Sequence, residues 1–278
     1  MTAVNEALRL AAEHLANTSD TARLDAEVLM AHALGVSRSE MLLRHARDEA
    51  PAAFATLVER RANHEPVAYI TGSQEFYGRA FHVSPAVLIP RADSETTVAA
   101  ALQAKPAARR VLDCGTGSGA LLLTLLAELS GSSGIGTDRS AAALAVAQRN
   151  AEALGLTARA DLREADWTRR GWADELGRFD LVIANPPYVE DSASLDPSVR
   201  DHEPHGALFA GPEGLEDYRA LIPQLPELLA PEGAAVLEIG HRQADTVSAI
   251  AQATGFASEL HRDLAGRPRA LVLRSPRR

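Results

Sequence analysis

The first 64 residues carry apolar side chains at the spacing of amphipathic helices. From Leu8 to Val58, leucine, valine and methionine recur at helical spacing, which is typical of helices that bury one face. Breaks in this pattern fall at residues 17–20, at residues 35–37 and at Pro51. The pattern therefore predicts a small bundle of helices, with a role in packing or in partner binding.

A short segment with the pattern of a β-hairpin follows the helical region. Aromatic and β-branched residues surround Gly78, which predicts a hairpin over residues 74–83. An extended stretch follows over residues 87–91, and we expect a helix to begin near Asp93. We expect this piece to join two domains and to roof part of a functional site.

Strand-like apolar runs alternate with helical periods from about residue 92 onward. We expect strands over residues 110–114, 134–138, 158–163, 179–184, 234–239 and 270–274, and helices over residues 120–129, 141–154, 215–229 and 245–253. Strands separated by helices are typical of α/β proteins with an open, doubly wound, mostly parallel sheet. Ligands of such sheets bind beyond the carboxyl ends of the strands.

Composition and charge exclude several classes of protein. Of 278 residues, 46% are hydrophobic and 23% are charged, which is ordinary for a chain that forms a core. Neither a membrane-spanning run of roughly 20 apolar residues nor a signal peptide is recognisable, so we expect a cytoplasmic protein with no membrane partner. The net charge of −9 argues against direct binding of nucleic acid through its phosphates. With Cys114 as the single cysteine, the chain has no internal disulfide and no cysteine zinc cluster.

A strand that runs into a glycine-rich turn and then a helix spans residues 111–120. Gly115, Gly117 and Gly119 occupy alternate positions, and glycines let the main chain bend sharply and contact a ligand directly. The N–H groups at the start of the following helix also face such a ligand. We therefore predict a cofactor-binding turn.

Two carboxylates accompany the glycine turn. Asp113 precedes it, placed to meet a cationic or hydroxyl-bearing group, and Asp138 ends the next strand about 20 residues on, where it can accept both hydroxyls of a ribose. This spacing indicates an adenosine-type cofactor. The run Gly115-x-Gly117-x-x-Ala120 also satisfies the dinucleotide fingerprint, so the turn alone leaves a nicotinamide dinucleotide open.

The tetrad Asn185-Pro186-Pro187-Tyr188 follows the predicted strand over residues 179–184. The two prolines carry no N–H and the Asn185 side chain adds a carbonyl, so these groups accept hydrogen bonds. Tyr188 adds a flat aromatic face. The tetrad suits a planar amide or amino group, whose two hydrogens would be held so that the nitrogen lone pair faces an electrophile. We predict Asn185, Pro186 and Tyr188 as catalytic residues.

The tetrad and several further motifs resemble one known family. The motifs are PVAYITG at 66–72, EFYG at 75–78, VLIPR at 87–91, DCGTGSG at 113–119, NPPY at 185–188, EP to LFAG across 203–211, and LEIG at 237–240. In this order they resemble the HemK-like protein-glutamine methyltransferases, over the chain from the helical N-terminus to the last strand. The tetrad alone is shared with DNA methyltransferases, whereas the joined set is far more specific.

The resemblance implies a function and a set of site residues. Members of this family transfer a methyl group from S-adenosylmethionine to the side-chain amide nitrogen, N5, of the glutamine in the Gly-Gly-Gln loop of peptide chain release factors. The glycine turn would surround the methionine part of the cofactor, with Asp138 at the ribose and Trp167 at the adenine. The implied cofactor-binding residues are Asp113, Gly115, Thr116, Gly117, Ser118, Gly119, Asp138, Trp167 and Asn185, and the implied substrate-binding residues are Asn185, Pro186, Pro187 and Tyr188.

The resemblance also implies the organisation of the chain. Residues 1–72 would form a helical bundle that binds the release factor, residues 73–91 a β-hairpin linker, and residues 92–278 a Rossmann-like class I methyltransferase domain. We expect class I release factors as protein partners, and a monomer. Cys114 stands where the family often has an aliphatic residue, so we expect it to be a small buried hydrophobic residue.

Two other functions fit part of the sequence. A methyltransferase that acts on amino groups of nucleic-acid bases would use the same tetrad. The net charge of −9 and the lack of a recognisable target-recognition domain argue against it, because such enzymes must also extract the base. A dinucleotide-binding oxidoreductase would explain the glycine turn and Asp138, but not the acceptor-rich tetrad.

A few polar residues remain outside these predictions. The run at 202–205 holds two histidines and a carboxylate, but Pro204 breaks helical geometry, and no metal is predicted. Arg91 and Glu95 are four residues apart, which predicts a pair on a helix, with a role of Arg91 in the cleft as the alternative. Glu238 ends a strand on the ligand side, either as a site residue or as a structural carboxylate.

Overall fold

The computed structural model describes residues 2–275 of the chain, which divides into two compact units. The first unit comprises Met1–Ser73 and Leu195–His202, and the second comprises Gln74–Ser194 and Glu203–Arg278. Residue 1 and residues 276–278, which the predicted domains include, lie outside the described residues.

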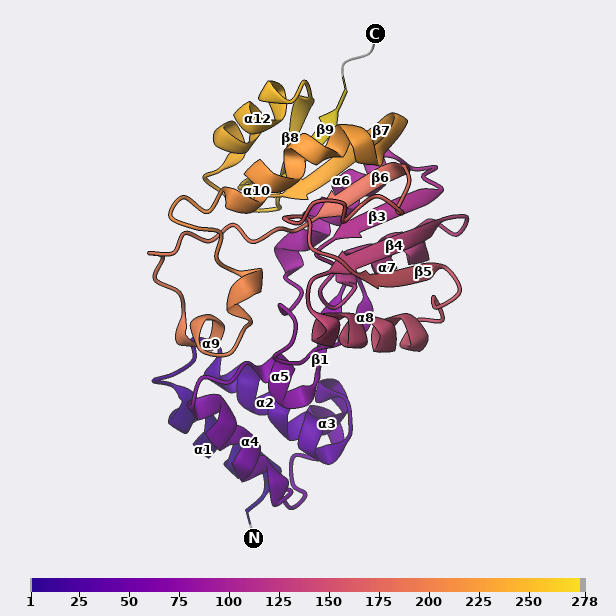
Figure 1. Cartoon of the computed structure of the whole chain (residues 1–278). Helices are drawn as coiled ribbons and strands as arrows, with labels where there is room; N and C mark the ends of the chain where they lie inside the picture. The colour runs from indigo at the N-terminus through magenta and orange to yellow at the C-terminus, as the bar shows by residue number, and fades with distance from the viewer. Residues whose placement is uncertain (1, 276–278) are drawn as a thin grey trace. The chain divides into compact units, whose positions relative to one another are not determined.

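The first unit is a bundle of short helices (Figure 1). They are α1 (Val4–Leu15), α2 (Ala22–Leu34), α3 (Arg38–Arg44), α4 (Ala53–Ala62), α5 (Val67–Thr71) and α9 (Pro197–Arg200). The core of the bundle includes Leu8, Leu29 and Met41, all at most 2% exposed. The side chains of Asp25 and Arg61 form an ion pair of 2.7 Å between α2 and α4. The prediction of a helical N-terminal region is confirmed.

The second unit is built on a mixed sheet. Within residues 2–275 this sheet has seven strands, in the spatial order β5-β4-β3-β6-β7-β9-β8. They are β3 (Arg110–Cys114), β4 (Ser133–Asp138), β5 (Ala160–Glu164), β6 (Phe179–Ala184), β7 (Leu229–Glu238), β8 (Ala257–Arg262) and β9 (Pro268–Arg274). The strands from β5 to β7 run parallel, and β9 runs antiparallel to both β7 and β8. The predicted hairpin forms a separate pair, β1 (Ser73–Phe76) and β2 (Arg79–His82).

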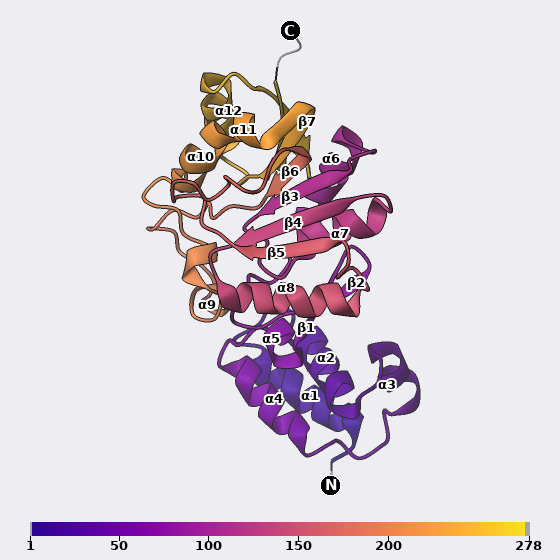
Figure 2. The same ribbon diagram turned by 45° about the vertical axis from the view of Figure 1, so that its right-hand side comes forward.

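Helices cover both faces of this sheet (Figures 1 and 2). One face carries α6 (Glu95–Ala104), α7 (Ala120–Glu128) and α8 (Ala141–Ala153), and the other carries α10 (Glu216–Leu221), α11 (Leu225–Leu228) and α12 (Ala244–Ala253). Successive residues of a strand point to opposite faces, so Val111 joins the first core and Leu112 the second. Double coverage explains why the inner strands β6 and β7 contain continuous apolar runs, LVIA and AAVL. The predicted doubly wound, mostly parallel α/β fold is confirmed.

Two elements differ from the prediction. The helix expected over residues 215–229 is divided into α10, the 3₁₀ turn η3 (Ile222–Gln224) and α11, because Pro223 and Pro226 cannot donate helical hydrogen bonds. Strand β8 was not predicted, because it lies at the sheet edge with mostly exposed, polar side chains and lacks an apolar run. Two further 3₁₀ turns are η1 (Ala92–Ser94) and η2 (His205–Ala207).

None of the helices within residues 2–275 combines the length and the hydrophobicity needed to cross a bilayer.

Candidate active site

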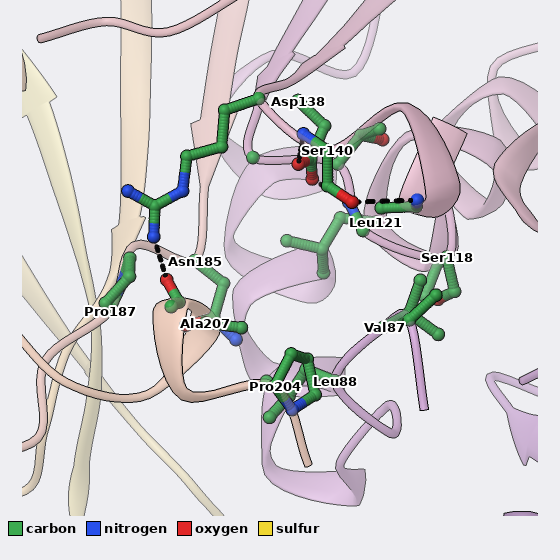
Figure 3. A pocket seen from close by; sticks show the side chains of 18 of the residues that line it. Val87, Leu88, Ser118, Leu121, Asp138, Ser140, Asn185, Pro187, Pro204 and Ala207 are labelled. Carbon is green, nitrogen blue, oxygen red and sulfur yellow. Dashed lines mark hydrogen bonds between the residues drawn. The ribbon is translucent and has the colours of Figure 1, made fainter. Parts of the chain in front are cut away.

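A cavity lies at the carboxyl ends of the central strands of the second unit (Figure 3). The glycine turn after β3, Asp138 at the end of β4 and the tetrad after β6 all contribute to its lining. Strand β3 pairs with both β4 and β6, so the topology brings these three segments to one edge of the sheet. The predicted placement of the tetrad strand beside the glycine turn is confirmed.

The glycine turn has the backbone geometry that its alternating glycines indicated. Gly115, Gly117 and Gly119 have φ angles of +77°, +54° and +81°, which lie in the left-handed region. The N–H groups of Gly115 and of the next residue both donate to the carbonyl of Thr137 at 2.8 Å. A Cβ atom on Gly115 would lie 3.0 Å from Cη2 of Trp167, so the turn packs closely on the indole.

Asp138 faces the cavity and also holds the glycine turn. Its Oδ2 accepts from the N–H of Gly117 and its Oδ1 from the N–H of Ser140, each at 2.9 Å. Figure 3 shows Asp138 and Ser140 on the same side of the cavity. Because each carboxylate oxygen can accept more than one hydrogen bond, both oxygens keep capacity for ligand hydroxyls.

Asp113 lies in the core next to the turn and is not among the described residues that line the cavity. Its Oδ2 accepts from the hydroxyl of Thr116 at 2.8 Å, whereas its Oδ1 has no partner within residues 2–275. Burial raises the pKa of Asp113 to about 7, against the hydrogen bond from Thr116, which lowers it. In this structure Asp113 braces the turn from inside. Gly119, which also does not line the cavity, is the N-cap residue directly before α7.

Cys114 is fully buried, as predicted for a small hydrophobic residue. Burial raises the pKa of its thiol well above the ordinary value, so the sulfur stays protonated.

The tetrad presents part of its length to the cavity. Asn185 and Pro187 line it, and Figure 3 shows them across the cavity from Ser118 and Val87. Pro186 and Tyr188 are not among the described lining residues. Burial raises the pKa of Tyr188 to about 12, with the nearby carboxylate of Glu238 adding to the effect, so the phenol is neutral.

Trp167 lines the cavity together with a residue that the sequence analysis missed. Its indole N–H donates to Oδ1 of Asp217 at 3.0 Å, and Asp217 lies on α10, 50 residues further along the chain. Burial raises the pKa of Asp217. No local pattern pointed to Asp217. Arg139 directly follows β4 and Asp166 lies two residues beyond the end of β5. Both also line the cavity, and their positions near strand ends could have indicated them.

Arg91 lines the cavity, which is the alternative that the sequence left open. Its guanidinium pairs with Glu203, whose other oxygen accepts from the N–H of Ile89 at 3.2 Å. Glu95 instead accepts from the N–H of Tyr77 at 2.9 Å. The predicted Arg91–Glu95 pair is therefore wrong, because the backbone at Arg91 is extended and α6 begins only at Glu95.

The hairpin piece reaches the cavity through Phe76 and residues 86–88, in line with the expectation that it roofs part of the site. Glu238, in contrast, is 1% exposed and is not among the described lining residues. Its Oε2 accepts from the hydroxyl of Thr97 at 3.2 Å, and burial raises its pKa to about 6. Glu238 is thus a buried carboxylate behind the site.

Within residues 2–275, no group of three histidine, cysteine or acidic side chains is arranged to hold a metal ion. His202 belongs to the first unit, whereas Glu203 and His205 belong to the second.

The groups that line the cavity fit a ligand with a flexible chain, a diol and a flat heteroaromatic base. A glycine turn allows close approach of a ligand chain, the Asp138 carboxylate can accept from a diol, and the Trp167 ring can pack on a flat heteroaromatic base. Asn185 offers an acceptor for a second, amide-bearing molecule.

The fold and this site define a class I methyltransferase. The catalytic domain of hMettl16 has the same fold, with a TM-score of 0.54 and 16% identity, over 82% of this chain and 94% of that one. Residues 6–72 match the family model described as PrmC N-terminal domain, and residues 90–200 match the methyltransferase small domain.

Two relatives are both named release factor glutamine methyltransferase. The one from Cereibacter sphaeroides is 43% identical over 279 residues, which cover 98% of each chain. The one from Geobacter sulfurreducens is 43% identical over 244 residues, which cover 85% of this chain and 84% of the relative. The chain belongs to the release factor glutamine methyltransferase family.

Proposed function

We propose that this protein methylates the side-chain amide nitrogen of the glutamine in the Gly-Gly-Gln motif of peptide chain release factors, with S-adenosylmethionine as the methyl donor. The observation that carries this proposal is the acceptor-rich tetrad after β6, next to the glycine turn after β3. The names of the relatives support the same substrate. Family membership also favours methyl transfer over the dinucleotide-binding alternative.

The residues of the cavity fit S-adenosylmethionine. Asp138 would accept from the ribose hydroxyls, Trp167 would pack on the adenine, and the glycine turn from Gly115 to Ser118 would surround the methionine part. When bound, S-adenosylmethionine supplies a methyl carbon made electrophilic by a positively charged sulfur. Asp113 would act indirectly, because it holds the hydroxyl of Thr116 and thereby the turn.

The tetrad would bind and orient the substrate amide. Oδ1 of Asn185 and the carbonyl of Pro186 would accept the two N–H hydrogens, and Tyr188 would pack against the flat group. An amide nitrogen is a weak nucleophile because its lone pair is delocalised. Orientation can lower such a barrier by several kcal/mol, about 7–11 at its upper limit. The same acceptors stabilise the positive charge that develops on the nitrogen.

The two units would divide the work of recognition. The helical residues 1–72 would bind the release factor, and the hairpin piece over residues 73–91 would link them to the methyltransferase domain. The match of residues 6–72 to the PrmC N-terminal domain supports a dedicated role for this region.

A labelled-methyl assay tests the proposed function. The protein and labelled S-adenosylmethionine are incubated in three separate reactions, with purified release factor, with DNA and with RNA. We expect label in the release factor alone, and one added methyl on the loop glutamine by mass spectrometry. A release factor with that glutamine replaced by alanine is the matched control and should stay unlabelled. Label in DNA or RNA, or in the control, would contradict the proposal.

A further inference from the structure

The side-chain amide of Gln243 joins three loops next to the tetrad. Gln243 directly precedes α12. Its Nε2 donates to the carbonyls of Tyr188 at 3.1 Å and Gly214 at 3.0 Å, and its Oε1 accepts from the N–H of Gly240 at 3.0 Å. Both hydrogens of the amide nitrogen are therefore used, so the side chain is held from both ends.

The space around this amide is closed by backbone and by the tetrad. A Cβ atom on Gly214 would lie 2.3 Å from the carbonyl oxygen of Tyr188 and 3.0 Å from Nε2 of Gln243. A Cβ atom on Gly240 would lie 2.7 Å from Oε1 of Gln243 and 3.4 Å from Cδ2 of Tyr188. Glycine at both positions leaves the room that Gln243 needs to reach the end of the tetrad.

The tetrad has a stiff backbone, so the positions of its two ends determine the directions of the groups between them. The rings of Pro186 and Pro187 fix their φ angles, and Asn185 and Pro186 each precede a proline, which restricts them to extended backbone. At one end, Ala184 pairs with Cys114 of β3 and with β7. At the other end, Gln243 holds the carbonyl of Tyr188. The directions of the Asn185 side chain and the Pro186 carbonyl follow from these two attachments.

The chain beyond the tetrad has its own support. The N–H of Val189 donates to the carbonyl of Leu208, and the N–H of Ala210 donates to the carbonyl of Val189, each at 2.9 Å. These bonds do not involve Gln243. The N–H of Val189 belongs to the same planar peptide unit as the carbonyl of Tyr188. Loss of the Gln243 amide therefore leaves the path of the chain in place and removes one of the two hydrogen bonds that fix the orientation of this peptide.

We propose that Gln243 is a positioning residue for methyl transfer, which holds the carbonyl of Tyr188 and thereby aims the acceptors of Asn185 and Pro186 at the substrate amide. Gln243 is not among the described residues that line the cavity, so it acts through the tetrad. This inference rests on the proposed function.

The first test removes the hydrogen bonds of Gln243 and keeps its length. For Gln243→Met, we expect kcat for methyl transfer to release factor to fall by about tenfold or more, while the Kd for S-adenosylmethionine stays within about threefold. Gln243→Glu places a carboxylate oxygen against the two carbonyl oxygens, so we expect a larger fall in kcat. The control is Gln252→Met, at an exposed position on α12, which should leave kcat unchanged.

A second variant approaches the same contact from the other side. Gly240→Ala places a methyl against Oε1 of Gln243 and should give the same selective loss of kcat. Both changes break the same contact between Gln243 and Gly240. The kcat of the double variant should therefore be little lower than that of the more impaired single variant. Hydrogen exchange at the Gly240 amide gives a readout that does not need the reaction, and exchange should be faster in Gln243→Met.

Two outcomes would overturn the inference. One is a Gln243→Met variant that keeps kcat within about twofold of the wild type. The other is a parallel loss of kcat, cofactor affinity and thermal stability, which would assign Gln243 a purely structural role. A wild-type protein that does not methylate release factor would contradict the proposed function instead, and the exchange measurement would still show whether Gln243 holds Gly240.

Discussion

At the scale of single residues, the chemistry of the tetrad depends on which hydrogen-bonding groups it lacks. The two prolines contribute carbonyls without N–H groups, and Asn185 places its side chain at the cavity. Such a segment can hold both hydrogens of a carboxamide. Asn185 is therefore expected to matter for orientation more than for cofactor binding.

The variant Asn185→Ala tests this division. We expect turnover of release factor to fall by about a hundredfold, because a misplaced amide rarely attacks, whereas cofactor affinity stays within about tenfold. Turnover is measured with labelled methyl groups, and cofactor affinity by calorimetry. Equal losses of both quantities would count against the orienting role of Asn185.

A second prediction at this scale concerns the buried carboxyl of Glu238. Burial raises its pKa from the ordinary 4.5 to about 6, so the folded state holds the proton more tightly than the unfolded chain. The stabilising effect is fully present below pH 4.5 and is lost as the pH rises through 6. The size of this loss is about 2 kcal/mol.

The variant Glu238→Gln removes this titration. Urea denaturation of both proteins between about pH 4.5 and 7 gives the difference in unfolding free energy, wild type minus variant. We expect that difference to decrease by about 2 kcal/mol over this range. A flat or increasing difference would contradict the raised pKa.

At the scale of elements, the glycine turn has a backbone conformation and a close packing that both disfavour any residue other than glycine. Gly119 has a φ angle of +81°, and a Cβ atom there would lie 2.8 Å from Cδ1 of Leu123. A side chain at this position would therefore cause both backbone strain and a clash with Leu123. At Gly155, which follows α8, φ is +68° and nothing lies within 4 Å of an added Cβ, so only the backbone strain applies.

This pair of glycines allows a matched comparison. We expect Gly155→Ala to cost about 1–2 kcal/mol of unfolding free energy from left-handed strain alone. Gly119→Ala should cost about 1–3 kcal/mol more because Leu123 must move. Urea denaturation at neutral pH measures both variants. Equal costs would mean that the packing against Leu123 does not limit the turn.

The elements show which parts of the structure are readable from the sequence. The glycine turn and the tetrad each directly follow a strand, and Asp138 is the last residue of one. Because ligands of parallel sheets bind at the carboxyl ends of the strands, these local patterns were enough to predict that the three segments meet at one edge. Edge strand β8 was not predicted, because its mostly exposed side chains form no apolar pattern.

Long-range contacts set the limit of prediction for the site. The ion pair of Arg91 with Glu203 joins residues 112 positions apart, and the hydrogen bond of Trp167 with Asp217 joins residues 50 positions apart. Neither pair lies within one helix or strand. No periodicity or motif in the sequence links such residues, because only the folded chain brings them together.

At the scale of the whole molecule, the chain divides into two compact units, each made of two separate stretches of sequence. The segment Leu195–His202 follows the tetrad in sequence yet belongs to the helical unit, where His202 Nε2 lies 3.2 Å from the carbonyl of Asn63. Its sequence position alone could not indicate this. The helical unit also exposes leucines on α3, with Leu43 at 83%.

The proposed role of the helical unit predicts a selective effect at Leu43. For Leu43→Asp, we expect the KM for release factor to rise by about tenfold, because an exposed leucine at a protein interface loses its apolar contact, while cofactor affinity is unchanged. The control Leu264→Asp alters a fully exposed leucine of the second unit. Similar effects of the two variants on KM would argue against α3 as a contact surface.

The central claim concerns the geometry of a carboxamide at the tetrad, and a crystal structure of the protein with release factor and S-adenosylhomocysteine tests it most directly. We expect the glutamine amide nitrogen to lie about 2.9 Å from both Oδ1 of Asn185 and the carbonyl oxygen of Pro186. A complex in which Asn185 faces away from the glutamine, or in which the glutamine lies outside the cavity, would contradict it.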